Sequence, residues 1–139
     1  MSPADAKGPD RVLIVESRYY PAIADGLIAG ALPLLEEAGL HHERLEVPGV
    51  FEIPAAVRHA AFGGNYAGFL TFGCVIRGET THYDHICEEA SRAIMDLTMR
   101  DSLAVGFGIL TCETMDQAIV RADPKGKNKG AEAAAPVSP

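Results

Sequence analysis

Hydrophobic and polar positions along the chain form two alternating kinds of segment. Short apolar runs rich in β-branched residues, such as RVLIVES at 11–17 and GFLTFGCVI at 68–76, predict buried strands. Between such runs, apolar residues recur near helical spacing, as in Ile23, Leu27 and Ala31. The predicted strands cover residues 11–17, 42–47, 68–76 and 103–110, and the predicted helices cover residues 21–39, 54–62, 81–100 and 114–122.

Two of the predicted helices carry more specific expectations. Pro33 lies inside the first helix and predicts a kink or a break, because proline cannot donate a backbone hydrogen bond. In the last helix, the spacing of Met115, Ala118 and Ile119 predicts that these three side chains face the interior.

Four strand–helix units in succession predict an α/β fold with a parallel sheet and right-handed crossovers. We therefore expect a three-layer α-β-α sandwich of the flavodoxin-like class, with a four-stranded parallel sheet. A length of 139 residues fits one domain over 1–139. Residues 1–10 are expected to be a flexible N-terminal arm, and residues 123–139 a basic loop and a short C-terminal tail.

Composition excludes several classes of protein. A formal net charge of −7 argues against a nucleic-acid binder, which needs a basic face. The three cysteines, at positions 74, 87 and 112, have no CxxC spacing, and we expect Cys74, Cys87 and Cys112 to be small buried residues. His82 and His85 do not complete a metal-ligand pattern with them, so we expect no bound metal. No apolar run approaches the ~20 residues of a membrane span, and the polar N-terminus lacks a signal sequence. These features predict a soluble, cytoplasmic protein.

The carboxyl ends of the strands are the expected site of ligand binding in such a sheet. Tyr19 and Tyr20 follow the first strand, and Phe51 and Glu52 follow the second. Aromatic rings at strand ends suit a planar heterocycle, with ordinary core packing as the alternative. Glu52 could either cap the next helix or accept hydrogen bonds from a polar ligand.

The segment 77–82, after the third strand, combines features of an anion site. Its glycine and the free amide groups at a helix start favour a phosphate, and four basic residues against one acid at 121–129 add positive charge. Solvated lysines and a structural ion pair at Arg77 are the alternative. His82 lies in the first helical turn, where the dipole favours a neutral imidazole that can accept and return a proton; a capping or surface histidine is the alternative.

Four stretches of the sequence resemble the lumazine synthase family. They are VPGVFEIP at 47–54, GCVIRGETTHYDHICEEA at 73–90, FGILTCETMDQAIVRA at 107–122 and NKG at 128–130. The resemblance implies condensation of 5-amino-6-ribitylaminouracil with 3,4-dihydroxy-2-butanone 4-phosphate to 6,7-dimethyl-8-ribityllumazine, with loss of phosphate and water. This is the penultimate step of riboflavin biosynthesis, and it implies a transferase that uses no cofactor.

The same resemblance implies roles for individual residues. His82 would transfer protons, and Glu79, Thr80 and Arg121 would bind the phosphate of the butanone. The residues that would contact ribitylaminouracil are Tyr19, Val50, Phe51, Glu52, Cys74, Val75, Ile76, Phe107 and Lys129. Phe107 and Lys129 would enter from a neighbouring subunit, because the family's site lies between protomers of a pentamer.

The resemblance also implies a homo-oligomer. A loop at 121–130 without an insertion favours a sixty-subunit icosahedral shell, whereas Pro136 and Pro139 shorten the C-terminal helix and favour a smaller assembly. Association with riboflavin synthase is a further expected partnership.

Two other function classes remain open at the level of sequence. One is a flavin- or nucleotide-binding module that uses the same crevice without catalysis. The other is a shell-forming structural protein whose catalysis has decayed, against which the joint presence of His82, Arg121 and Glu52 argues.

Overall fold

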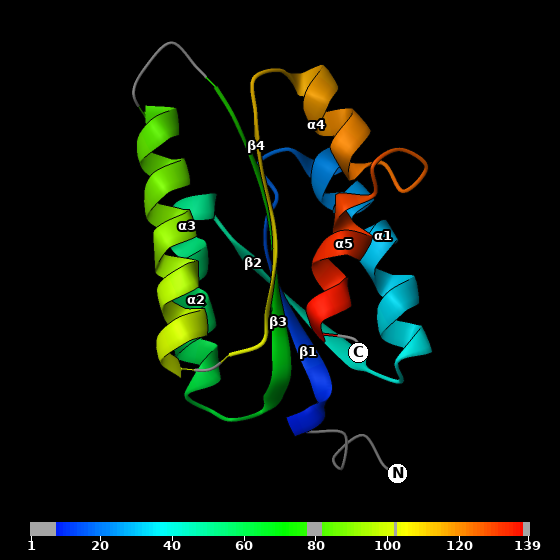
Figure 1. Ribbon diagram of the computed structural model, residues 1–139, viewed down its shortest axis with the longest axis vertical. Helices are drawn as coiled ribbons and strands as arrows, with labels where there is room; N and C mark the ends of the chain where they lie inside the picture. The colour runs from blue at the N-terminus through cyan, green and yellow to red at the C-terminus, as the bar shows by residue number, and fades with distance from the viewer. Residues whose placement is uncertain (1–7, 78–81, 102, 138–139) are drawn as a thin grey trace.

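The computed structural model describes residues 8–77, 82–101 and 103–137. Its elements in chain order are β1 (Gly8–Ser17), α1 (Pro21–Glu37), β2 (His41–Val47), η2 (Val50–Glu52), α2 (Ile53–Ala61), β3 (Tyr66–Ile76), α3 (His82–Asp101), β4 (Val105–Cys112), α4 (Met115–Ala122), α5 (Lys129–Ala134) and η3 (Ala135–Val137). The four strands form one parallel sheet in the order β2-β1-β3-β4. Helices α1, α4 and α5 cover one face and α2 and α3 the other (Figure 1). The predicted three-layer, flavodoxin-like α/β fold is confirmed.

The two faces of the sheet bury separate apolar clusters. Because side chains alternate along a strand, Leu70 and Phe72 of β3 pack on the side of α1, whereas Phe69 packs on the side of α2 and α3. All three side chains are buried, as expected for a central parallel strand covered on both faces. The faces of the sheet are therefore filled by core packing, and the loops at its carboxyl edge are left to form a binding site.

Helix α1 continues through Pro33 without the break that the sequence left open. The helix runs as one element from Pro21 to Glu37, and Pro33 is exposed. Ala31 and Leu35, on either side of the proline, are both fully buried against the sheet. Packing on both sides of Pro33 thus holds the helix together despite the missing backbone donor.

Helix α4 presents a different face to the core from the one predicted. Thr114 caps the helix, its hydroxyl accepting a hydrogen bond from the Gln117 amide at 3.2 Å. Ala118 is buried as expected, but Met115 and Ile119 are 39% and 50% exposed, so their predicted burial is wrong. The reason is close packing: a Cβ at Gly26 of α1 would lie only 3.0 Å from the Ala122 carbonyl oxygen. Only small side chains fit between these helices.

The predicted boundaries of the first and fourth strands also differ from the structure. The fourth strand spans Val105–Cys112 rather than 103–110, because its ladder with β3 continues to the pair Ile76 and Cys112. The first strand begins at Gly8, which pairs with Tyr66 of β3. Residues 8–10 therefore belong to the sheet and not to the predicted N-terminal arm.

Candidate active site

One large pocket lies at the carboxyl ends of β1 and β3, bounded by η2 and the first turns of α3. Its volume is about 720 Å³, within the range of small-molecule sites. Seven residues of the sequence-derived site line it together: Tyr19, Val50, Phe51, Glu52, Cys74, Val75 and Ile76. We call this hollow the aromatic pocket. It brings residues from four separate segments of the chain to one place.

The wall made by η2 depends on a glycine in the central strand. A Cβ at Gly73 of β3 would lie 2.7 Å from Cγ2 of Val50, so only glycine lets η2 seat this closely on the sheet. Val50 is buried by this contact, whereas Phe51 and Glu52 remain exposed along the pocket. Glu52 occupies the N-cap position of α2 but makes no side-chain cap hydrogen bond. Of its two predicted uses, hydrogen bonding to a polar ligand is therefore the one favoured by the geometry.

Two tyrosines form another part of the pocket wall. The rings of Tyr19 and Tyr20 meet edge to face, with centroids 4.9 Å apart and planes at 77°. Tyr19 is 74% exposed, which leaves its ring free for a second aromatic partner. Burial raises the pKa of Tyr20, and Tyr19 and Cys74 add to the shift. The Tyr20 phenol is thus protonated at neutral pH and can donate a hydrogen bond.

The thiol in the pocket is not a nucleophile. Cys74 is 7% exposed, and burial, together with the neighbouring thiol of Cys112, raises the pKa of Cys74 to about 12. A thiol with this pKa stays protonated at neutral pH and is inert. Cys74 and Cys112 are buried as the sequence predicted, but Cys87 is only partly buried.

A second pocket, of about 600 Å³, runs along β4 and is closed by α4 and α5. It contains Phe107, Arg121 and Lys129, and we call it the basic pocket. The Arg121 guanidinium donates to the Cys112 sulfur at 3.2 Å, and within the part of the chain that the structure describes it meets no carboxylate. Lys129 pairs with Glu132 at 2.9 Å. Among the described residues none lines both pockets, so Phe107, Arg121 and Lys129 lie apart from the seven predicted residues of the aromatic pocket.

The remaining predicted residues fall outside what the structure describes. Glu79 and Thr80 precede α3, and His82 is the first residue of that helix, but its side chain is likewise outside the described part. The backbone of α3 nevertheless starts beside the aromatic pocket, because His85 and Ile86 of its first turns line that pocket. Arg77 makes the ion pair that the sequence left open, with its Nε donating to Glu113 at 3.0 Å.

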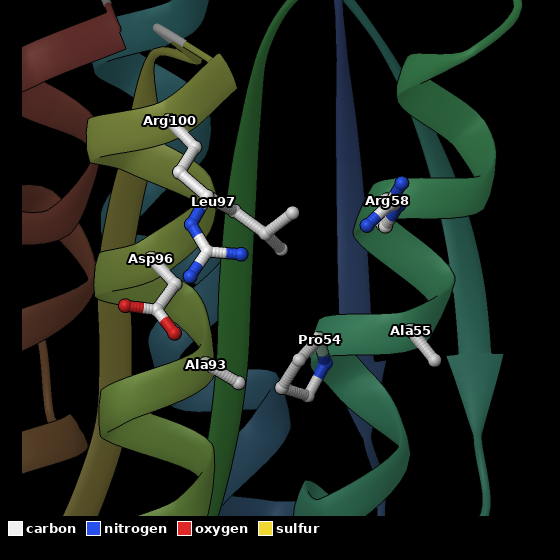
Figure 2. Close-up of a pocket in the computed structure, with 7 residues that line it drawn as sticks. All are labelled: Pro54, Ala55, Arg58, Ala93, Asp96, Leu97 and Arg100. Carbon is white, nitrogen blue, oxygen red and sulfur yellow. The ribbon is translucent and has the colours of Figure 1, made fainter.

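A third hollow, between α2 and α3, contains none of these residues. Figure 2 shows Arg58 of α2 and Arg100 of α3 at its sides, with Leu97 and Pro54 forming its apolar part. Its volume is about 240 Å³, and its carboxylate, Asp96, accepts a hydrogen bond from Arg92 at 3.2 Å. This hollow is separate from the carboxyl edge of the sheet.

Sequence reasoning missed part of the aromatic pocket. Tyr20, which the sequence already offered as a strand-end aromatic for a planar ligand, also lines it, and so do five residues that were not proposed as ligand contacts: Ser17, Pro48, Gly49, His85 and Ile86. A usable signal existed for His85 and Ile86, which lie three and four positions after His82 and so share its side of the helix. Neither side chain could be assigned to the pocket without knowing how α3 is rotated against the sheet.

Two features are absent from the described part of the chain. No group of three or more His, Cys, Asp or Glu residues among the described side chains could hold a metal ion. Over the same described ranges, no helix is both long and apolar enough to cross a membrane.

Comparison with known proteins supplies the family. Residues 10–138 match the family model of 6,7-dimethyl-8-ribityllumazine synthase. Proteins of that name from Paramagnetospirillum magneticum and Zymomonas mobilis are each 50% identical, over 131 and 124 residues, covering 89% of this chain and 87% or 88% of the relative. The protein of that name from Desulfovibrio desulfuricans is 46% identical over 134 residues, covering 94% of this chain and 85% of the relative. Since the match spans almost the whole chain at this identity, the chain belongs to the 6,7-dimethyl-8-ribityllumazine synthase family.

Proposed function

We propose that the chain condenses 5-amino-6-ribitylaminouracil with 3,4-dihydroxy-2-butanone 4-phosphate to form 6,7-dimethyl-8-ribityllumazine. The observation that carries the proposal is the aromatic pocket, in which seven of the nine residues expected to contact ribitylaminouracil line one hollow in a chain of this family. The reaction makes the chain a transferase of riboflavin biosynthesis.

The chemistry needs little beyond correct placement of two reactants. The free amine of the uracil attacks the ketone carbonyl and gives a Schiff base with loss of water. Phosphate then leaves from the terminal carbon, and ring closure with dehydration completes the lumazine. Much of the rate enhancement comes from holding both reactants together, and His82 relays protons between the reacting nitrogen and oxygen atoms.

The aromatic pocket is the half of the site that takes the ring and ribityl chain. Tyr19 stacks on the flat ring, and Glu52 accepts hydrogen bonds from its polar groups. The backbone amides of Glu79 and Thr80 bind the phosphate together with the start of α3, where the helix dipole favours an anion.

The basic pocket is the other half, and a neighbouring copy of the chain supplies it. Arg121 lies with Phe107 and Lys129, both of which the resemblance assigns to a neighbour, and none of the three lines the aromatic pocket. Phe107 is 45% exposed on β4, a strand at the edge of the sheet that can face another subunit. Contact between two different surfaces repeats around a ring, which fits a pentamer.

Higher assembly and location belong to the same proposal. Pentamers are proposed to form a sixty-subunit shell in the cytoplasm, with riboflavin synthase as a partner, and mass measurement in solution distinguishes pentamer, decamer and shell.

Formation of lumazine tests the activity directly. Mixing the purified protein with both substrates should produce the absorbance of 6,7-dimethyl-8-ribityllumazine and release one phosphate per product. Tight binding of riboflavin or its phosphate without any turnover would instead support the non-catalytic binding module.

Replacing His82 by alanine should slow turnover by about tenfold without abolishing it, because positioning survives the loss of one proton relay. Steady-state kcat measures the effect, and His59→Ala, at an exposed histidine of α2, is the matched control. An unchanged kcat and pH profile in the His82 variant would remove its assigned role.

A further inference from the structure

The most deeply buried carboxylate described in the molecule lies next to the aromatic pocket and is not used by the proposed reaction. Glu16 is the penultimate residue of β1 and is only 1% exposed. Its strand neighbours on the same face, Val12 and Ile14, belong to the apolar core under α1. A charge in such a place is costly unless it is paired and hydrogen-bonded.

Two arginines pair with this carboxylate. Arg44 of β2 donates from Nε to Oε2 at 2.7 Å and from Nη2 to Oε1 at 3.0 Å, a two-pronged contact. Arg18 donates from Nη1 to Oε1 at 2.7 Å. Burial alone would raise the pKa of Glu16, but the hydrogen bonds and charges of Arg44 and Arg18 outweigh it and lower the pKa below its ordinary value. Glu16 is therefore ionised in the folded protein at neutral pH.

Arg18 continues the network across the loop that precedes α1. Its second nitrogen, Nη2, donates to Oδ1 of Asp25 in α1 at 2.6 Å. The guanidinium thus joins the end of β1 to α1 and spans the loop at residues 18–20. We call Glu16, Arg18, Asp25 and Arg44 the ionic clamp.

Tyr19 follows Arg18 directly in the chain. Its ring is 74% exposed, and its one ring contact with another described aromatic side chain is the edge of Tyr20. Packing against the core therefore does little to hold this ring. The hydrogen bonds of Arg18 restrain the backbone immediately before it.

We propose that the ionic clamp positions Tyr19: it holds the loop at residues 18–20 in place, so that the Tyr19 ring already lies at the aromatic pocket before substrate binds. None of the four clamp residues lines the aromatic or the basic pocket, so they act through Tyr19 and not on the substrate. This inference rests on the proposed function, in which Tyr19 stacks on the uracil ring.

Kinetics provide the first test, using Glu16→Gln. The clamp variant should raise KM for ribitylaminouracil by about tenfold, which corresponds to about 1.4 kcal/mol, while kcat and the KM for butanone phosphate change little. The matched control is Glu43→Gln: Glu43 of β2 also accepts hydrogen bonds across strands, from Arg11 and Tyr66, but away from the pocket. It should leave both KM values unchanged.

A second variant keeps the test available if Glu16→Gln does not fold. Asp25 is exposed on α1, so Asp25→Asn removes only the link between the loop and the helix. It should raise KM for ribitylaminouracil in the same direction by a smaller factor. Glu36→Gln, at an exposed acid of the same helix, is the control.

Fluorescence provides a readout that needs no activity. The chain contains no tryptophan, so Tyr19→Trp introduces a single reporter at the loop. Adding Glu16→Gln or Asp25→Asn should lower the time-resolved anisotropy of the indole through faster local motion, whereas adding Glu43→Gln should not. Failure of the wild type to make lumazine would defeat the proposed function but leave this measurement valid. Equal anisotropy in all backgrounds, or equal KM shifts for Glu16→Gln and Glu43→Gln, would overturn the clamp.

Discussion

Arg121→Ala should lower kcat/KM for 3,4-dihydroxy-2-butanone 4-phosphate by about 100-fold, because a charge-assisted contact to phosphate contributes about 1.5–3 kcal/mol. The guanidinium is half-buried, and among the described side chains its hydrogen-bond partner is the sulfur of Cys112 and not a carboxylate, so its charge is available to an anion. The KM for ribitylaminouracil should stay close to that of the wild type. Steady-state kinetics with each substrate varied in turn measures both effects.

The control for this variant is another cation of the same region. Lys127→Ala removes the same charge from an exposed side chain and should change kcat/KM less than twofold. If the two variants behaved alike, Arg121 would contribute only general positive charge. Unchanged kinetics in Arg121→Ala would remove it from the phosphate site.

Mixed oligomers should recover activity that neither parent has. A chain with Tyr19→Ala and Glu52→Ala lacks a working aromatic pocket, and a chain with Arg121→Ala lacks a working basic pocket. When the two are co-expressed, about a quarter of the contacts in a cyclic ring join an intact aromatic pocket to an intact basic pocket. Lumazine formation should therefore rise to about a quarter of the wild-type rate, far above either variant alone.

The design has an internal control. Co-expressing the double variant with a chain that carries all three substitutions yields no fully intact contact and should give no recovery. The same absence of recovery with Arg121→Ala would mean that all the residues of a site come from one chain. This result would contradict the shared site while leaving the reaction itself in place.

The local sequence was sufficient for much of the fold because the strands are short apolar runs and the intervening segments repeat with helical period. Its errors arose where packing against another element decides the outcome. Met115 and Ile119 fit an inward-facing pattern, yet the close approach of α4 to Gly26 leaves room only for small side chains. Pro33 is tolerated because burial on both sides fixes the helix around it.

The grouping of the site residues into pockets was likewise predictable from the sequence only in part. The residues that follow β1, those of η2 after β2, and the last residues of β3 could be assigned to one pocket, since the carboxyl ends of parallel strands meet at one edge. The placement of Arg121 with Phe107 and Lys129 could not, because it depends on how α4 and α5 pack along β4. The partnership of Glu16 with Arg44, which are 28 residues apart, likewise needs the sheet.

By itself, the sequence determined the alternation of strands and helices, the parallel sheet and the family to which the chain belongs. These follow from periodicity and short motifs, which are local properties of the chain. Only the tertiary structure decided which of the residues predicted for the site line one pocket and which line another, and that a buried carboxylate is joined through Arg18 to the loop bearing Tyr19. The physical reason is that both depend on distances between segments remote in sequence, which helix packing and strand register set.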